Sequence, residues 1–102
     1  MTAAEQTDDD LVVVIARSGG VAGMTREWRA VPAGDDLPHW HELVDRCPWD
    51  AAPPPSRGAD RFQWRIEVRH GETAVREARL GDTQVEGPWR ALVDEVRQAA
   101  GG

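Results

Sequence analysis

The stretch Arg61-Phe-Gln-Trp-Arg-Ile-Glu-Val-Arg-His70 decides the fold of this chain. Its apolar residues alternate without interruption with charged or polar ones; they are Phe62, Trp64, Ile66 and Val68. Side chains on a β-strand point to opposite faces with a period of two, so this stretch has one apolar and one charged face. The pattern predicts an antiparallel strand that packs one face on a core and leaves the other in water.

The N-terminal half predicts a hairpin. Residues 11–16 form a largely β-branched apolar run without alternation, typical of a central strand that is covered on both faces or partly shielded on one. Three glycines within residues 17–23 favour a tight turn, because glycine adopts positive φ at little cost. Residues 24–31 then alternate again, which predicts a second strand paired with the first.

A helix is predicted to begin at Leu37. Pro38 suits a first helical turn, and either Asp35 or Asp36 can serve as the N-cap. Its apolar side chains recur at helical spacing and would face the sheet; they are Leu37, Trp40, Leu43, Val44 and Cys47. The proline-rich residues 48–60 predict an irregular connection, with Trp49 pinning it to the body of the domain.

The C-terminal half predicts another hairpin and another helix. After a short turn at Gly71 and Glu72, residues 73–80 return as a fourth strand. A three-residue loop would pair Val68 with Ala74, Trp64 with Ala78, Phe62 with Leu80, and Arg65 with Glu77 on the wet face. This register turns Arg76 inward and Val75 outward, so a β-bulge is an alternative.

The last helix is predicted to begin at Gly87-Pro88. Its apolar stripe is Trp89, Leu92, Val93 and Val96, extended by Ala99 or Ala100. The element order is therefore ββαββα. It predicts an α+β two-layer sandwich, in which a four-stranded, mainly antiparallel sheet carries both helices on one face.

Composition sets the class of the protein. At 102 residues we expect an acidic, disordered tail over residues 1–10 and a single domain over residues 11–100. The net charge of −6 argues against a nucleic-acid partner, and no apolar run is long enough to span a membrane. Cys47 is the only cysteine, which rules out an internal disulfide. With no signal peptide visible, we expect a reducing, cytoplasmic location.

Three features resemble catalytic or binding motifs. His41-Glu42-Leu-Val-Asp45 is close to a zinc-peptidase motif, but its intervening residues face the core and no third ligand follows, so we expect no metal. Cys47 fits a small buried hydrophobe better than a nucleophile. Of the five tryptophans, Trp28, Trp40, Trp64 and Trp89 lie on predicted core faces, and Trp49 alone is free to bind a ligand. We therefore expect a binding domain with no enzymatic activity.

Several segments together resemble the emfourin family of bacterial protease inhibitors. They are Arg17-Ser-Gly-Gly-Val-Ala-Gly-Met24, Arg26, Asp35-Asp-Leu-Pro38, Arg57-Gly-Ala-Asp-Arg-Phe-Gln-Trp-Arg-Ile66 and Pro88-x-x-Ala-Leu-Val93. The resemblance covers about residues 11–99. It implies inhibition of a protealysin-like metalloprotease of the thermolysin family, by an inhibitor that itself binds no cofactor. We expect this chain to be monomeric when it is not bound to a protease.

The resemblance further implies that two adjacent loops block the protease active site, one carrying a carboxylate that reaches the protease zinc. In the turn His70-Gly71-Glu72 no aspartate is present, so Glu72 is the first candidate and His70 the alternative. Apolar candidates for the substrate subsites are Leu37 and Ala33, although Leu37 equally fits a staple residue of the helix start. Asp35 and Asp36 are the reserve carboxylates.

Counting chain reversals gives an independent expectation about these two loops. If the second and third strands run the same way, residues 32–37 and 70–73 lie at one end of the sheet and the Gly19-Gly20 turn at the other. Two other functions stay open: a non-inhibitory adaptor or regulatory subunit, and a small-molecule binder with a pocket between helices and sheet.

Overall fold

The computed structural model describes residues 11–20, 23–51 and 62–101. The strands are β1 (Leu11–Gly19), β2 (Met24–Ala30), β3 (Phe62–His70) and β4 (Thr73–Gly81). The helices are α2 (Leu37–Arg46) and α3 (Pro88–Ala99), and short 3-10 turns η1 (Gly34–Asp36), η2 (Trp49–Ala51) and η3 (Asp82–Gln84) precede or follow them. The predicted order ββαββα and the α+β class are confirmed. The predicted tail, Arg61 and most of the proline-rich connection lie outside the described residues.

The sheet has the strand order β2-β1-β3-β4, and each neighbouring pair is antiparallel. The β1 strand is central, as its unbroken apolar run predicts. On its face away from the helices, Val14 and Ala16 are only 4% and 8% exposed. The direct neighbours of Val14 are Arg29 of β2 and Glu67 of β3, and side chains of this length can shield apolar surface beside them. Of the two predicted alternatives, β1 is therefore a central strand whose outer face is partly shielded by neighbouring side chains, and not one covered by helices on both faces.

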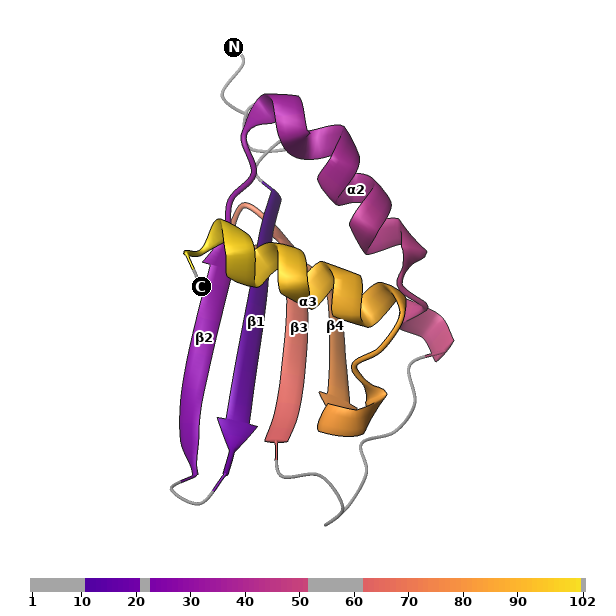
Figure 1. Cartoon of the computed structure of the whole chain (residues 1–102). Helices are drawn as coiled ribbons and strands as arrows, with labels where there is room; N and C mark the ends of the chain where they lie inside the picture. Colours follow the sequence, from indigo (N-terminus) through magenta and orange to yellow (C-terminus); the bar gives the residue numbers. More distant parts are fainter. Residues whose placement is uncertain (1–10, 21–22, 52–61, 102) are drawn as a thin grey trace.

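Both helices pack on the same face of the sheet, and α3 crosses all four strands (Figure 1). The four tryptophans predicted to be in the core, Trp28, Trp40, Trp64 and Trp89, are all buried. In α3 the buried side chains are Trp89, Leu92, Val93 and Val96, as predicted. The proposed extension through Ala99 or Ala100 is wrong, because both are exposed where the helix end passes the edge strand β2.

The predicted register between β3 and β4 is wrong by two residues over most of its length. Trp64 pairs with Leu80, Ile66 with Ala78, and Val68 with Arg76. The loop holds only two residues, Gly71 and Glu72, with Gly71 at φ 62° as the first residue of a tight hairpin turn. The register shifts by one residue between Val68 and Arg69, so the bulge alternative is confirmed.

The bulge changes which charges meet on the wet face. Arg65 faces Arg79 directly instead of Glu77. It still reaches Glu77 diagonally, with Nη1 of Arg65 lying 3.8 Å from Oε2 of Glu77. The expected attraction between these two side chains is thus present, although its register position was predicted incorrectly.

Ile66 tests how much the core depends on β3. Its side chain is 0% exposed, so Ile66→Ala should lower the free energy of unfolding by about 2–5 kcal/mol through lost burial and an unfilled cavity. Val75→Ala, on the neighbouring strand at 48% exposure, is the matched control and should cost less than about 1 kcal/mol. Urea denaturation of both variants measures the difference; equal losses would mean that the β3 face is not the centre of the core.

Candidate functional site

The two candidate loops lie at the same end of the sheet. Strands β2 and β3 are both antiparallel to β1 and so run in the same direction. The last residue of β2, Ala30, pairs with Val13, and the last residue of β3, His70, pairs with Leu11. The segment from Val31 to Leu37 and the turn at Gly71 and Glu72 therefore leave the sheet together, with the start of β1 between them (Figure 1). We call this region the shared end.

Helix α2 also contacts the shared end. The imidazole rings of His41 and His70 lie 6.3 Å apart between centroids and are nearly parallel, at 19°. Leu37 precedes His41 by four residues and so lies on the same face of the helix. Leu37 is half-buried and packs against the core, which supports its role as a residue that fixes the helix start.

The remaining candidates at the shared end are exposed. They are Ala33, Asp35, Asp36 and Glu72. Asp36 occupies the N-cap position of α2, but neither aspartate caps the helix with its side chain, so the expectation that one is engaged there is wrong. The reason is local geometry: η1 already winds the backbone, and Asp36 has helical angles of φ −92° and ψ −8° instead of the extended ones of a side-chain cap. Both carboxylates stay in solvent.

Val31 adds an apolar group that the sequence did not single out. It directly follows β2 and is 64% exposed, one of the three large hydrophobic side chains exposed among the described residues. The alternation of residues 24–31 assigned it to a strand, and only the end of β2 at Ala30 reveals that it is free to contact a partner. The shared end thus combines an exposed apolar side chain with exposed carboxylates.

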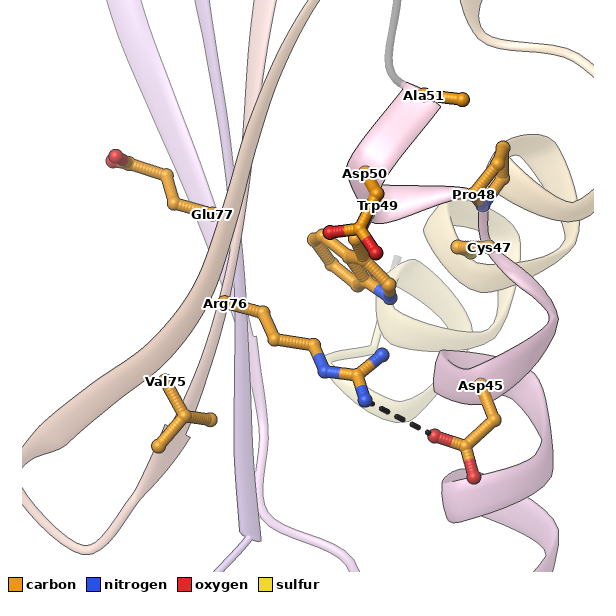
Figure 2. Close-up of a pocket in the computed structure, with 9 residues that line it drawn as sticks. All are labelled: Asp45, Cys47, Pro48, Trp49, Asp50, Ala51, Val75, Arg76 and Glu77. Carbon is orange, nitrogen blue, oxygen red and sulfur yellow. Dashed lines mark ion pairs between the residues drawn. The ribbon is translucent and has the colours of Figure 1, made fainter.

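A hollow lies beside the edge strand β4, away from the shared end. It has a volume of about 690 Å³ and is lined by the end of α2, by η2 and by β4 (Figure 2). Arg76 crosses it from β4, with Nη2 3.6 Å from Oδ1 of Asp45 and its guanidinium 5.8 Å from the Trp49 ring. The bulge explains this position, because it places Arg76 opposite Val68 on the face that carries the helices. Arg76 thus links β4 to the end of α2 along one side of this hollow.

Trp49 is not free to bind a ligand, contrary to the prediction. Its Nε1 donates a 2.8 Å hydrogen bond to the carbonyl oxygen of Val44, and its ring packs edge-on against Trp89 at 4.9 Å. The expectation that Trp49 pins the connection to the domain is confirmed. The shared end is therefore the better candidate for a binding site.

The comparison with known proteins agrees with the resemblance. A family model described as Emfourin matches residues 15–97 of the 102-residue chain. The chain belongs to the Emfourin family. No curated protein and no solved structure matches it. The match runs from the middle of β1 through most of α3, and it includes the segment from Val31 to Leu37 and the turn at Gly71 and Glu72.

The residues that resembled a metal or catalytic motif are engaged elsewhere in this Emfourin domain. His41 stacks on His70, and Asp45 pairs with Arg76, so the two ends of the zinc-like motif turn to different strands. Within the described ranges, no group of three or more His, Cys, Asp or Glu side chains is arranged to hold a metal ion. No described helix is both long and apolar enough to cross a membrane.

Cys47 behaves as a small buried hydrophobe, as predicted. It is 4% exposed, and its Sγ donates weak hydrogen bonds of 3.5 Å to the carbonyl oxygens of Leu43 and Pro88. Burial raises the pKa of the thiol from 9.0 to about 11, although the nearby Arg76 guanidinium opposes the shift. A neutral thiol is a poor nucleophile, so the structure gives no support to a catalytic cysteine.

The Cys47 thiol should be visible in the pH dependence of stability. The folded state keeps its proton up to about pH 11, whereas the unfolded thiol loses it near 9.0, so the free energy of unfolding should fall as pH rises through this window, by about 1–3 kcal/mol. The chain contains no lysine and no tyrosine, and Cys47 is its only cysteine, so no other side chain is expected to titrate between pH 9 and 11. Urea denaturation at successive pH values measures the slope.

Cys47→Ala is the control for this measurement. The variant removes the titrating group while keeping a small apolar side chain, so its stability should be flat over the same pH range. If both proteins lose stability equally, the loss does not come from the Cys47 thiol, and burial does not raise its pKa as stated.

Proposed function

We propose that this chain is a protein inhibitor of a bacterial zinc metalloprotease of the thermolysin family, of the protealysin type. The observation that carries the proposal is membership of the Emfourin family over residues 15–97. The shared end supports it, because two separate segments leave one end of the sheet and present carboxylates and apolar groups to a partner. In this function the chain is not an enzyme and needs no cofactor of its own.

Glu72 is our proposed zinc-reaching residue. Its exposed side chain is at the tip of a two-residue turn, and no ion pair among the described residues engages it. A carboxylate oxygen is a good ligand for zinc, and the preceding Gly71 allows the backbone to turn so tightly. His70 is the weaker candidate, because it is half-buried and its ring faces His41.

The segment that precedes α2 would fill the hydrophobic subsites of the protease. Ala33 is exposed, whereas Leu37 lies partly against the core. Val31 is also exposed, so we add it to Ala33 and Leu37 as a candidate contact. Asp35 and Asp36 remain the reserve carboxylates, since neither is used as a side-chain cap. The alternative function is an adaptor that binds a protein through the same surface without blocking a catalytic site.

Inhibition itself is the first experiment. Stoichiometric addition of the purified chain to a thermolysin-like protease that cleaves casein should abolish the activity, because an active-site inhibitor competes with every substrate. The matched comparison is a protease with a catalytic serine, which should remain active. Unchanged casein cleavage by several thermolysin-like proteases, at micromolar inhibitor, would favour the adaptor.

The second experiment concerns the contact residue. Glu72→Ala should weaken inhibition by a factor on the order of a hundred, as expected for losing a charged group at a buried hot spot. Its thermal stability should hardly change, since the side chain is exposed. Glu27→Ala, an exposed glutamate on β2, is the control and should inhibit like the wild type. If an Asp35→Ala/Asp36→Ala variant abolishes inhibition while Glu72→Ala does not, the zinc-reaching carboxylate lies before α2.

A further inference from the structure

Three arginines converge on one tryptophan, two of them from the strand ends opposite the shared end. The guanidinium carbons of Arg17, Arg26 and Arg97 lie 5.5, 4.9 and 5.0 Å from the centre of the Trp28 ring. Arg17 and Arg26 are direct partners on β1 and β2, whereas Arg97 reaches the ring from α3. Cation–π attraction holds each of them, but like charges facing each other across two strands destabilise a sheet.

The carboxylates nearest to these arginines bond to other side chains. A hollow of about 300 Å³ beside Arg17 and Arg97 contains two of them, Asp82 and Asp94. Asp82 accepts a 2.9 Å hydrogen bond from the Trp64 indole, and Asp94 lies 3.3 Å from Arg90. Among the described residues, no carboxylate is within ion-pair distance of Arg17 or Arg97. Asp82 thus shares the hollow with Arg17 and Arg97 but forms an ion pair with neither, so both guanidinium groups keep N–H donors for a carboxylate of a partner.

Apolar side chains surround the arginines. Phe62 is half-buried and lies 4.7 Å from the Arg17 guanidinium, and Met24, on the same face of β2 as Arg26, is 73% exposed. We call the set Arg17, Met24, Arg26, Trp28, Phe62 and Arg97 the arginine surface. Arginine, methionine and aromatic residues are the types enriched in protein–protein interfaces, which favours a protein partner over a free ion.

We propose that the arginine surface docks an acidic segment of a partner protein. Charge complementarity carries the proposal: carboxylates of the segment would pair with the Arg17 and Arg97 guanidinium groups, which bind them in a fork-like geometry. Apolar side chains of the same segment would pack on Phe62 and Met24. The hollow, at about 300 Å³, is large enough for side chains of a peptide and at the lower limit for a compact ligand.

This surface is independent of the proposed inhibitory one. Arg17 lies near the C-terminal end of β1, whereas the shared end flanks its beginning at Leu11. The strands extend beyond α3 in this direction, so α3 leaves their ends uncovered (Figure 1). A partner on the arginine surface would therefore leave Glu72 free, and the two functions can be tested separately.

The test uses the full chain and a fluorescein-labelled peptide of alternating aspartate and leucine, followed by fluorescence anisotropy at low salt. The peptide should bind at least roughly tenfold more tightly than one with asparagine in place of each aspartate, because charge-assisted bonds are the stronger ones. Arg17→Gln/Arg97→Gln should remove this preference. Arg97→Gln alone should reduce it, which keeps the test valid if the double variant does not fold.

The matched control is Arg29→Gln/Arg79→Gln, which removes the same charge from exposed positions on the opposite face of the sheet. It should bind the aspartate peptide like the wild type. An equal loss in this control would show only non-specific attraction and would overturn the proposal.

Two further outcomes would also overturn it. Displacement of the peptide by inorganic phosphate, but not by chloride at equal ionic strength, would indicate a site for small oxyanions. A dimer in light scattering that Arg17→Gln converts to a monomer would show that the surface joins two copies of this chain. Inhibition of the protease should be unaffected by any of these arginine substitutions.

Discussion

The row of side chains Trp28, Ile15, Ile66 and Ala78 is the contact on which the rest of the structure depends. These residues are direct neighbours across all four strands, and none is more than 5% exposed. Because side chains alternate along each strand, this row fixes which residues of every strand face the helices. A slip of one residue in β3 would place Arg65 and Glu67 in the core and expose Ile66, at a prohibitive cost.

The bulge in β4 adapts this sheet to the helix α2. Its extra residue places Arg76 on the helix-bearing face, where the guanidinium approaches Asp45 and Trp49. The contact is partly exposed, so it contributes little free energy, but it defines how α2 lies beside the hairpin. An inward charge and a bulge also make an edge strand a poor template for pairing with another chain. The same irregularity thus orients the helix and protects the edge of the sheet.

The sequence predicted the elements and both hairpins correctly, but not the register between β3 and β4. The alternation in β3 and the helical stripe of α3 are long and strongly periodic, so both could be identified from the sequence alone. The β4 register depended on the loop length and on one extra residue near Val75, and alternation carries no signal for either. Placing the two loops at one end required only counting chain reversals. The stacking of His41 on His70 could not be predicted, because it depends on how α2 is rotated over the sheet.

The two ends of the sheet differ in charge, and the topology explains how both can be used. The shared end exposes Asp35, Asp36 and Glu72, whereas the opposite end holds Arg17, Arg26 and Arg97. Arg17 lies six residues from Leu11 along β1, which separates them by about 20 Å, more than twice the Debye length at physiological salt. Each end therefore presents its own charge to a partner with little influence from the other. Asp82 and Asp94 also lie at the opposite end, yet neither Arg17 nor Arg97 forms an ion pair among the described residues. For a protein of net charge −6, arginines gathered in this way are better explained by recognition than by solubility, because scattered arginines would serve solubility equally well.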